Sequence, residues 1–380
     1  MTAPPATRAH LNTAGAGLLS PHALDTMIDV LHAERRDGAY ETELRLDGEL
    51  NEQLYDELAR LVGAAPDDIA YFDSATRAYA STLPLLEPGP GERVILSPYE
   101  YAGNLLSLLA LRERHGFTVD VIPLDSEGDL DLEWLERNVA DDVAFVSVPH
   151  VPSGCGIVNP VEEIGRILRG TDTFYVIDGC QSVGQLPVDV AALGCDLFTG
   201  AGRKFLCGPR GTGFAAVSER LRAALERGSR DLHVSAVDAR LAVEDRVHTA
   251  RTLELAERST AVAMGFLTTL REAPDPAGVD NTARAAELTA LLDAVPGIDV
   301  INPGRRQAGI VTFRHDRVSP ADLTAALGEC GITVWTITGA HTPQYMLDRG
   351  VTTAVRASVH WYTTTAQIEA LAAELRRITS

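Results

Sequence analysis

Residues 175–184, with the sequence YVIDGCQSVG, decide the fold. The stretch begins with apolar residues that favour β-structure and ends with polar ones. This pattern predicts a buried strand that carries polar side chains at its carboxyl end. In open α/β sheets, ligands bind outside the carboxyl ends of the strands. We therefore expect the polar side chains here, Asp178 and Gln181, to face a ligand.

A second stretch, residues 202–213 with the sequence GRKFLCGPRGTG, places a lysine in a glycine-rich loop. An enzyme that uses pyridoxal 5'-phosphate (PLP) needs a lysine that holds the cofactor as a Schiff base. It also needs an acid that keeps the ring nitrogen protonated, so that the ring can absorb electrons. Lys204 and Asp178 suit these two roles. The alternative is that Asp178 only caps the next segment and Lys204 is a solvated surface charge, as most isolated residues of these types are.

The joint pattern along the chain decides between the two interpretations. Asp-x-x-Gln-Ser-x-Gly from Asp178 is followed by PVDV at 187–190, LGCD at 193–196 and then Arg-Lys with Gly-Pro-x-Gly-x-Gly. This pattern resembles the class V aminotransferase family of fold-type I PLP enzymes. The family includes cysteine desulfurases, selenocysteine lyases, isopenicillin N epimerase-like proteins and ergothioneine-pathway C-S lyases. The resemblance implies PLP as the cofactor.

Helical and strand patterns alternate between residues 50 and 240, which indicates a mainly parallel sheet with helices on both faces. A helix is expected at 51–62, and strands are expected at 69–72, 93–96, 119–122, 144–148 and 174–177. Further along, the pattern predicts strands at 309–314, 333–337 and 355–361, and helices at 320–327 and 365–377.

The fold class that follows is α/β. The resemblance implies a fold-type I PLP-dependent transferase with a seven-stranded type of sheet in a large PLP-binding domain and a small α+β domain at the C-terminus. We expect an N-terminal arm at 1–20, the large domain at 21–265 and the small domain at 266–380. The arm contains LNTAGAG at 11–17, which is too rich in glycine for a helix or a regular strand.

Composition narrows the choice of partners and compartment. The 380 residues are 45% hydrophobic and carry a net charge of -20, with no basic cluster, so neither nucleic acid nor a membrane is an expected partner. No apolar run reaches the roughly 18 residues that span a bilayer, and residues 1–10 contain no signal core, so we expect a cytoplasmic protein. The five cysteines lack paired metal-ligand spacing, which favours buried free thiols over a disulfide or metal site. They are Cys155, Cys180, Cys195, Cys207 and Cys330.

Residues 71–78, YFDSATRA, follow a predicted strand and open a helix. The resemblance implies that the cofactor phosphate binds here, at Ala75 and Thr76. Free backbone N–H groups and the positive end of the helix dipole favour an anion, and the Thr76 hydroxyl can add a donor. The alternative is an ordinary Ser or Asp cap on a surface helix.

Three further residues match or replace cofactor contacts of the family. Gln181 matches a glutamine that donates to the ring hydroxylate oxygen. Tyr101 replaces a histidine that stacks on the ring; a phenol can also stack, but it is a poorer acid or base near neutral pH. Arg203, which directly precedes Lys204, replaces another histidine, and its guanidinium can bind the phosphate through two hydrogen bonds. It is also expected to lower the pKa of Lys204, the general base.

The resemblance implies an amino-acid substrate. Arg356, in VRASV at 355–359, matches the arginine that binds the substrate α-carboxylate, and a fork of donors suits a planar carboxylate. The alternative is a structural salt bridge. Asn12 in the arm, Asn104, and Ser153, which replaces a family asparagine, are the other expected substrate contacts. The arm can equally be one that only packs on the surface.

The chain departs from the desulfurases where they carry a nucleophilic cysteine, on a loop shortly before the carboxylate-binding arginine. The corresponding residues 335–342, WTITGAHT, contain no cysteine, and Cys330 ends a helix. Glu257 occupies the position of a threonine that reaches the phosphate of the neighbouring subunit in relatives, and a carboxylate would repel a phosphate. The run LELAE at 253–257, together with Arg203-Lys204, Glu100-Tyr101 and Asn104, resembles the ergothioneine-pathway lyases more than the desulfurases.

These features lead to a prediction of function. We expect a homodimeric, PLP-dependent carbon-sulfur β-lyase that acts on an S-substituted L-cysteine or its sulfoxide, with Lys204, Asp178 and Tyr101 at the catalytic centre. Decarboxylation-coupled deamination, epimerisation and transamination of a cysteine conjugate stay open as alternatives. Persulfide transfer, the desulfurase reaction, is disfavoured because the loop cysteine is missing.

Overall fold

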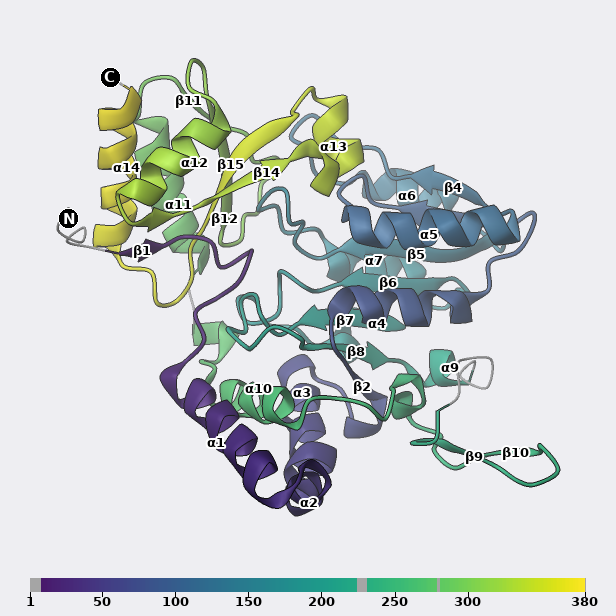
Figure 1. Cartoon of the computed structure of the whole chain (residues 1–380). Coiled ribbons are helices and arrows are strands. Elements are labelled where there is room, and N and C mark those ends of the chain that lie inside the picture. The colour runs from purple at the N-terminus through teal and green to yellow at the C-terminus, as the bar shows by residue number, and fades with distance from the viewer. Residues whose placement is uncertain (1–7, 224–230, 279–280, 380) are drawn as a thin grey trace.

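The strand predicted around residue 175 lies at the centre of a seven-stranded sheet in the computed structural model, which describes residues 8–223, 231–278 and 281–379 (Figure 1). The order across the sheet is β2-β8-β7-β6-β5-β3-β4. Within it, only β8 runs antiparallel to its neighbours. The strands are β2 (Ile69–Phe72), β3 (Arg93–Leu96), β4 (Thr118–Val121), β5 (Val143–Pro149), β6 (Phe174–Asp178), β7 (Leu197–Ala201) and β8 (Gly213–Val217). The α/β fold class with a mainly parallel sheet is confirmed.

Strand β6 shows why this sheet is buried on both faces. Successive side chains of a strand point to opposite faces. Accordingly, Tyr175 and Ile177 pack in one apolar cluster with residues of α3, α7 and α10, whereas Val176 packs in a second cluster with residues of α4 and α5. A strand covered on both faces is apolar throughout, which is the pattern that the sequence displays.

Helices alternate with the strands from β2 to β7, and further helices precede and follow the sheet. They are α1 (Pro21–Asp37), α2 (Ala39–Arg45), α3 (Leu54–Val62), α4 (Ala75–Thr82), α5 (Ala102–His115), α6 (Leu132–Asn138), α7 (Val161–Leu168), α8 (Val190–Leu193), α9 (Glu219–Arg222) and α10 (Thr260–Glu272). The predicted helix at 51–62 begins as a π-helical segment, Glu49–Gln53, and continues as α3. Short 3-10 turns occur at Pro66–Asp68, Leu83–Leu86, Ala250–Leu253 and Pro276–Gly278.

The C-terminal part forms a separate four-stranded antiparallel sheet in the order β11-β12-β15-β14 (Figure 1). Its elements are α11 (Asn281–Asp293), β11 (Ile298–Val300), β12 (Ile310–His315), α12 (Pro320–Glu329), β13 (Ile332–Thr333), β14 (Trp335–Thr338), α13 (Pro343–Asp348), β15 (Thr353–Ser358) and α14 (Thr365–Thr379). Helices α11, α12 and α14 share one apolar cluster with this sheet. The predicted boundary at residue 265 falls inside α10, and the division into domains stays a prediction.

The predicted strand at 355–361 is too long. It ends at Ser358 because the chain then turns: the His360 N–H donates to the Thr363 hydroxyl at 2.9 Å, and the His360 ring bonds the Phe205 carbonyl at 2.7 Å. These contacts fasten the end of the small sheet to the lysine loop of the large one. The periodicity of the sequence cannot predict contacts between segments that are so far apart along the chain.

The N-terminal arm contacts both the C-terminal part of the chain and the lysine loop of the large sheet. Its two-residue strand β1 (Ala9–His10) pairs in parallel with β13, and Asn12 forms a β-bridge with Ser358. Residues 1–7 of the predicted arm lie outside the described residues. The arm therefore approaches the end of β15, close to Arg356.

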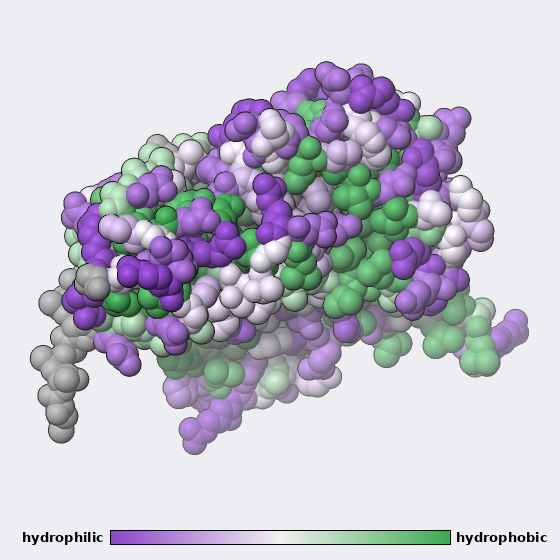
Figure 2. Space-filling view, turned by 90° about the horizontal axis from the view of Figure 1, so that it is seen from above, coloured by the Kyte–Doolittle hydropathy of each residue, from purple (hydrophilic) through white to green (hydrophobic). Residues whose placement is uncertain are grey.

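Two features of the surface bear on partners. A hairpin of β9 (Ser235–Val237) and β10 (Val243–Asp245) extends away from the body of the molecule (Figure 1). The face seen in Figure 2 carries hydrophilic residues over much of its rim and a group of hydrophobic residues towards its middle. Among the described residues, no helix is both long and apolar enough to cross a membrane.

Candidate active site

The loop between β7 and β8 holds Lys204 in a fixed conformation. The Gly208 N–H donates to the Gly202 carbonyl at 2.8 Å, and the Cys207 N–H donates to the Lys204 carbonyl at 2.9 Å. A Cβ at Gly202 would lie 2.8 Å from the Phe266 ring, and a Cβ at Gly208 would lie at the same distance from it. Both positions therefore need glycine, because the buried ring of α10 packs directly against the loop.

Burial sets the acidity of the lysine. It lowers the pKa of Lys204, and the nearby Arg203 and Arg356 act in the same direction, while Cys180 and Asp178 oppose them. A lowered pKa favours the neutral amine, which is the nucleophilic and basic form. The expectation that Arg203 lowers this pKa agrees in direction, although desolvation is the larger cause.

Asp178 lies at the carboxyl end of β6 and is held by two donors. Its Oδ1 accepts from the Cys180 N–H at 2.9 Å, and its Oδ2 accepts from the Asn104 side-chain amide at 2.8 Å. Asn104 was expected to contact substrate, but it lies against Asp178 and is buried. The two bonds fix the orientation of the carboxylate, which suits a fixed contact to a ring nitrogen.

A cavity of about 250 Å³ opens beside these groups, and we call it the cofactor-side cavity. It is lined by the start of α4, including Ala75 and Thr76, together with Tyr101, Asp178 and Lys204. Helix α4 is capped by Ser74, whose hydroxyl accepts from the Arg77 N–H at 3.2 Å. The N-terminus of α4 therefore lies at the cavity, and a helix N-terminus is a common site for an anion.

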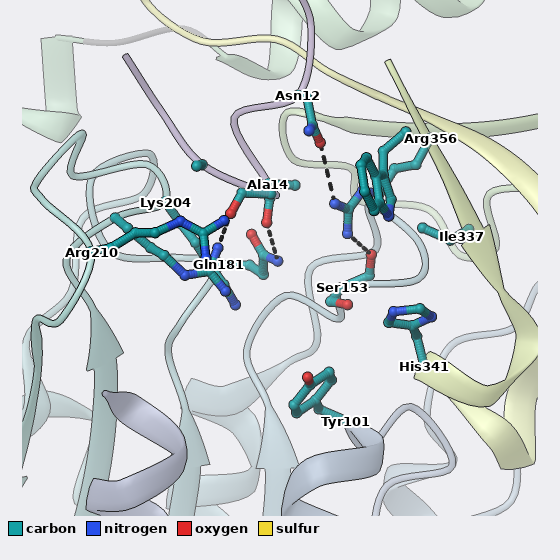
Figure 3. Close-up of a pocket in the computed structure, with 14 residues that line it drawn as sticks. Asn12, Ala14, Tyr101, Ser153, Gln181, Lys204, Arg210, Ile337, His341 and Arg356 are labelled. Carbon is teal, nitrogen blue, oxygen red and sulfur yellow. Dashed lines mark hydrogen bonds between the residues drawn. The ribbon is translucent and has the colours of Figure 1, made fainter. Parts of the chain in front are cut away.

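A second cavity of about 250 Å³, which we call the substrate-side cavity, shares Tyr101, Arg203, Lys204 and Arg210 with the first (Figure 3). Its remaining lining residues are Asn12, Ala14, Gly15, Ala16, Ser153, Gln181, Trp335, Ile337, His341 and Arg356. Tyr101, at the N-terminus of α5, lies between the two cavities. Lys204 therefore borders both the cofactor-side and the substrate-side cavity.

Arg356 faces the substrate-side cavity from β15 and is 5% exposed. Its Nη1 donates to the Ser153 carbonyl at 2.8 Å, whereas Nη2 lies 3.5 Å from Asn12 Oδ1. Nε is buried and has no hydrogen-bond partner among the described residues. Nε and Nη2 form one edge of the guanidinium, so this edge is available to a carboxylate. Burial and then Arg203 lower its pKa to about 10, which leaves it charged at neutral pH.

The arm closes the top of the substrate-side cavity, as Figure 3 shows for Asn12 and Ala14. The Gln181 amide donates to the Ala14 carbonyl at 3.1 Å, and Arg203 donates to the Gly15 carbonyl. Gln181 Oε1 is buried without a partner in the described residues. The contacts of Arg203 to the arm were not expected, because the resemblance assigned Arg203 to the cofactor phosphate and to lowering the pKa of Lys204.

The residues present fit PLP. A buried lysine, a carboxylate fixed by two donors and a helix N-terminus line one cavity, and Gln181 lines the adjoining one. When PLP is bound, Lys204, Asp178, Gln181 and the first turn of α4 are the residues that would hold it. Arg210 and His341 line the site although no motif in the sequence singled them out. Arg210 lies within the glycine-rich stretch around Lys204, whereas His341 lies in the segment where the desulfurases carry a cysteine.

Known proteins resemble this chain over most of its length. The cysteine desulfurase of Haloferax volcanii is 29% identical over 336 residues, which cover 84% of this chain and 77% of that protein. The apo structure of the cysteine desulfurase from Thermococcus onnurineus NA1 has a TM-score of 0.87 at 21% identity and covers 98% of this chain and 94% of its own.

Structures of the cystine C-S lyase C-DES share the fold as well. One, in complex with its reaction product cysteine persulfide, has a TM-score of 0.87 at 22% identity and covers 98% of both chains. Another holds glycine covalently linked to the PLP cofactor, with a TM-score of 0.85 at 21% identity, and covers 98% of this chain and 97% of its own. At these identities the likeness shows the fold alone.

The predicted activity on S-substituted cysteines is contradicted by these comparisons. Relatives that match by sequence are named cysteine desulfurase or probable cysteine desulfurase, and desulfuration is the reaction that the missing loop cysteine had disfavoured. The error has a plain cause. A missing loop cysteine removes one sulfur acceptor from the chain, but it does not identify the substrate, and the short run at 253–257 was too little to do so.

The model of the family described as Aminotransferase class-V matches residues 39–371. The match includes the stretch around Asp178, the lysine loop and the strand that carries Arg356. These are the segments that line the two cavities. The chain belongs to the class-V aminotransferase family and is a PLP-dependent enzyme.

Proposed function

We propose that this enzyme removes the sulfur of L-cysteine and passes it to a thiol that comes from outside the chain. One observation carries the proposal: Lys204, Asp178 and Arg356 line two adjoining cavities, and Nε of the arginine has no hydrogen-bond partner among the described residues. The names of the sequence relatives support cysteine as the substrate.

The roles of the residues follow from their positions. Arg356 binds the α-carboxylate through Nε and Nη2, because its Nη1 is engaged by Ser153. Lys204, whose pKa is lowered by burial, removes and returns the α-proton. Bound PLP supplies an electron sink at the α-carbon, and Asp178 keeps the ring nitrogen protonated. Tyr101 lies between the cavities, where its ring can stack on the cofactor.

The sulfur acceptor must be supplied by another molecule. Residues 335–342 contain no cysteine, and none of the described residues that line the substrate-side cavity is a cysteine. Cys180 lines the cofactor side, and burial raises its pKa. The overall reaction balances as L-cysteine plus a thiol giving L-alanine plus the persulfide of that thiol.

A homodimer is part of the proposal. Helix α1 exposes Leu24, Ile28 and Leu31, which are spaced i, i+4 and i+7 and therefore share one face. Tyr40 and Leu44 on α2 are 80% and 74% exposed. An apolar stripe of this kind on a surface helix is typical of a subunit interface. Sedimentation equilibrium tests this point, and a monomer at micromolar concentration would contradict it.

The experiment that tests the activity is product analysis. Purified, PLP-loaded enzyme is mixed with L-cysteine and dithiothreitol, and alanine and sulfide are quantified, with Lys204→Ala as the control. We expect equal amounts of alanine and sulfide, because dithiothreitol releases the transferred sulfur as sulfide. Formation of pyruvate and ammonia without alanine, or no product at all, would refute the proposal.

A further inference from the structure

His341 ends the 3-10 turn η7 (Gly339–His341), which follows β14, and it lines the substrate-side cavity. Figure 3 places its ring across this cavity from the arm, near Ser153 and Tyr101. Its Nδ1 is held by Thr338, so Nε2 is the ring nitrogen left for the cavity. The described residues provide no hydrogen bond to Nε2.

The contacts of Nδ1 suit both protonation states of the ring. Nδ1 lies 3.1 Å from the Thr338 carbonyl oxygen, 3.1 Å from the Thr338 hydroxyl and 3.3 Å from the Thr338 N–H. With a proton, Nδ1 donates to the carbonyl; without one, it accepts from the N–H or the hydroxyl. The ring can therefore gain or lose a proton at Nε2 while Nδ1 keeps a partner.

The other ionisable groups around this cavity are either ill suited to proton exchange near neutral pH or engaged elsewhere in the reaction. They are Tyr101, Arg203, Lys204, Arg210 and Arg356. Arginine stays charged, a phenol holds its proton, and the lysine is needed for the cofactor and the α-proton. No carboxylate is among the described lining residues. Helices α5 and α13, which pack against η7, place no charged side chain in the lining. Imidazole is the side chain that titrates nearest neutrality.

We propose that His341 is the catalytic acid-base residue of sulfur transfer, a role that rests on the proposed function. The acceptor thiol loses its proton to Nε2, and its thiolate attacks the sulfur of L-cysteine. A sulfur-sulfur bond forms, and the bond between that sulfur and the β-carbon breaks. Its electron pair stays with carbon, which takes up one proton and becomes the methyl group of alanine. The proton has moved from thiol to carbon, so no oxidant or reductant is needed.

If His341 had only a structural role, a variant that keeps its hydrogen bonds to Thr338 would keep full activity. Through Nδ1, His341 also closes a capping box with Thr338. Asparagine places its side-chain oxygen near the position of Nδ1 and can keep that cap, but it has no Nε2. Glutamine reaches towards the position of Nε2 but cannot titrate. His341→Asn and His341→Gln therefore separate the cap from the proton transfer.

The test compares the PLP-loaded wild type with both variants in three measurements: thermal unfolding, exchange of the α-hydrogen of L-alanine in D2O, and formation of alanine from L-cysteine with dithiothreitol. We expect unfolding close to wild type in His341→Asn, which keeps the cap, and a lower unfolding temperature in His341→Gln, which does not. Exchange should stay close to wild type in both variants. Alanine formation should fall by about 10²- to 10⁴-fold, the range for general acid-base catalysis. We also expect the wild-type rate of alanine formation to decline towards acidic pH, and we expect neither variant to show this decline.

The outcomes separate the two proposals. If wild type and His341→Asn form alanine at similar rates with the same pH profile, the role of His341 is overturned and the proposed function stands. If the wild type exchanges the α-hydrogen but forms no alanine from cysteine, the proposed function fails, and the role of His341 fails with it. If His341→Asn alone loses stability, His341→Gln decides, since its retained activity would likewise overturn the role.

Discussion

Replacing Arg356 tests how the substrate is recognised. Among the residues that the structure describes, Nη1 of Arg356 is bound to Ser153 at 2.8 Å, Nε has no partner and Nη2 has only the 3.5 Å contact to Asn12. A carboxylate can thus accept two hydrogen bonds from one edge. A hydrogen bond to a charged group contributes about 1.5 to 3 kcal/mol. Arg356→Ala should therefore weaken binding by about 3 kcal/mol, which is on the order of 150-fold.

The assay compares L-cysteine with cysteamine, which lacks the carboxylate. Binding to the PLP-loaded enzyme is followed by the change in cofactor absorbance. Wild type should prefer cysteine, and Arg356→Ala should bind both amines with similar affinity. Arg356→Lys keeps a positive charge without the planar fork, so it should lose about 10-fold, near one hydrogen bond. The reasoning is refuted if Arg356→Ala weakens cysteine and cysteamine equally, because the loss would then not involve the carboxylate.

Three further predictions concern the lysine, a buried acid and the core. Lys204→Ala should lack the absorbance of the cofactor bound as a Schiff base; an unchanged spectrum would contradict the assignment. Burial, then Asp178, raises the pKa of Glu100 to about 8. The native carboxyl is thus protonated where the unfolded one is ionised, so denaturant titrations should show the stability of the cofactor-free protein falling by up to about 1.4 kcal/mol per unit between pH 5 and 8. Glu100→Gln should reduce this dependence of the unfolding free energy on pH. An unchanged dependence in the variant would contradict the raised pKa of Glu100. Phe266→Ala should lower the free energy of unfolding by about 3 to 5 kcal/mol, and a loss under 1 kcal/mol would show that the ring is not packed as described.

The elements of the large sheet were predictable because their side-chain pattern is local. Residues 174–177 are apolar and bounded by turns, and a strand buried on both faces demands this. The carboxyl end of that strand also pointed to Asp178. The prediction of a strand at 355–361 was too long because the end of this strand is not set by a local pattern. It is set by a contact between His360 and Phe205, which are 155 residues apart.

The sequence alone determined the class of the chain, its family and its cofactor, because Asp178, Gln181 and Lys204 belong to short motifs at characteristic spacing. It did not determine the substrate: the prediction of an S-substituted cysteine was wrong, since residues that select a substrate come from separate segments. Only the tertiary structure brought Asn12 next to Arg356, 344 residues away, and His341 into the cavity of Lys204. Spacing along a chain encodes local geometry, whereas the walls of a cavity between two sheets depend on how those sheets pack together.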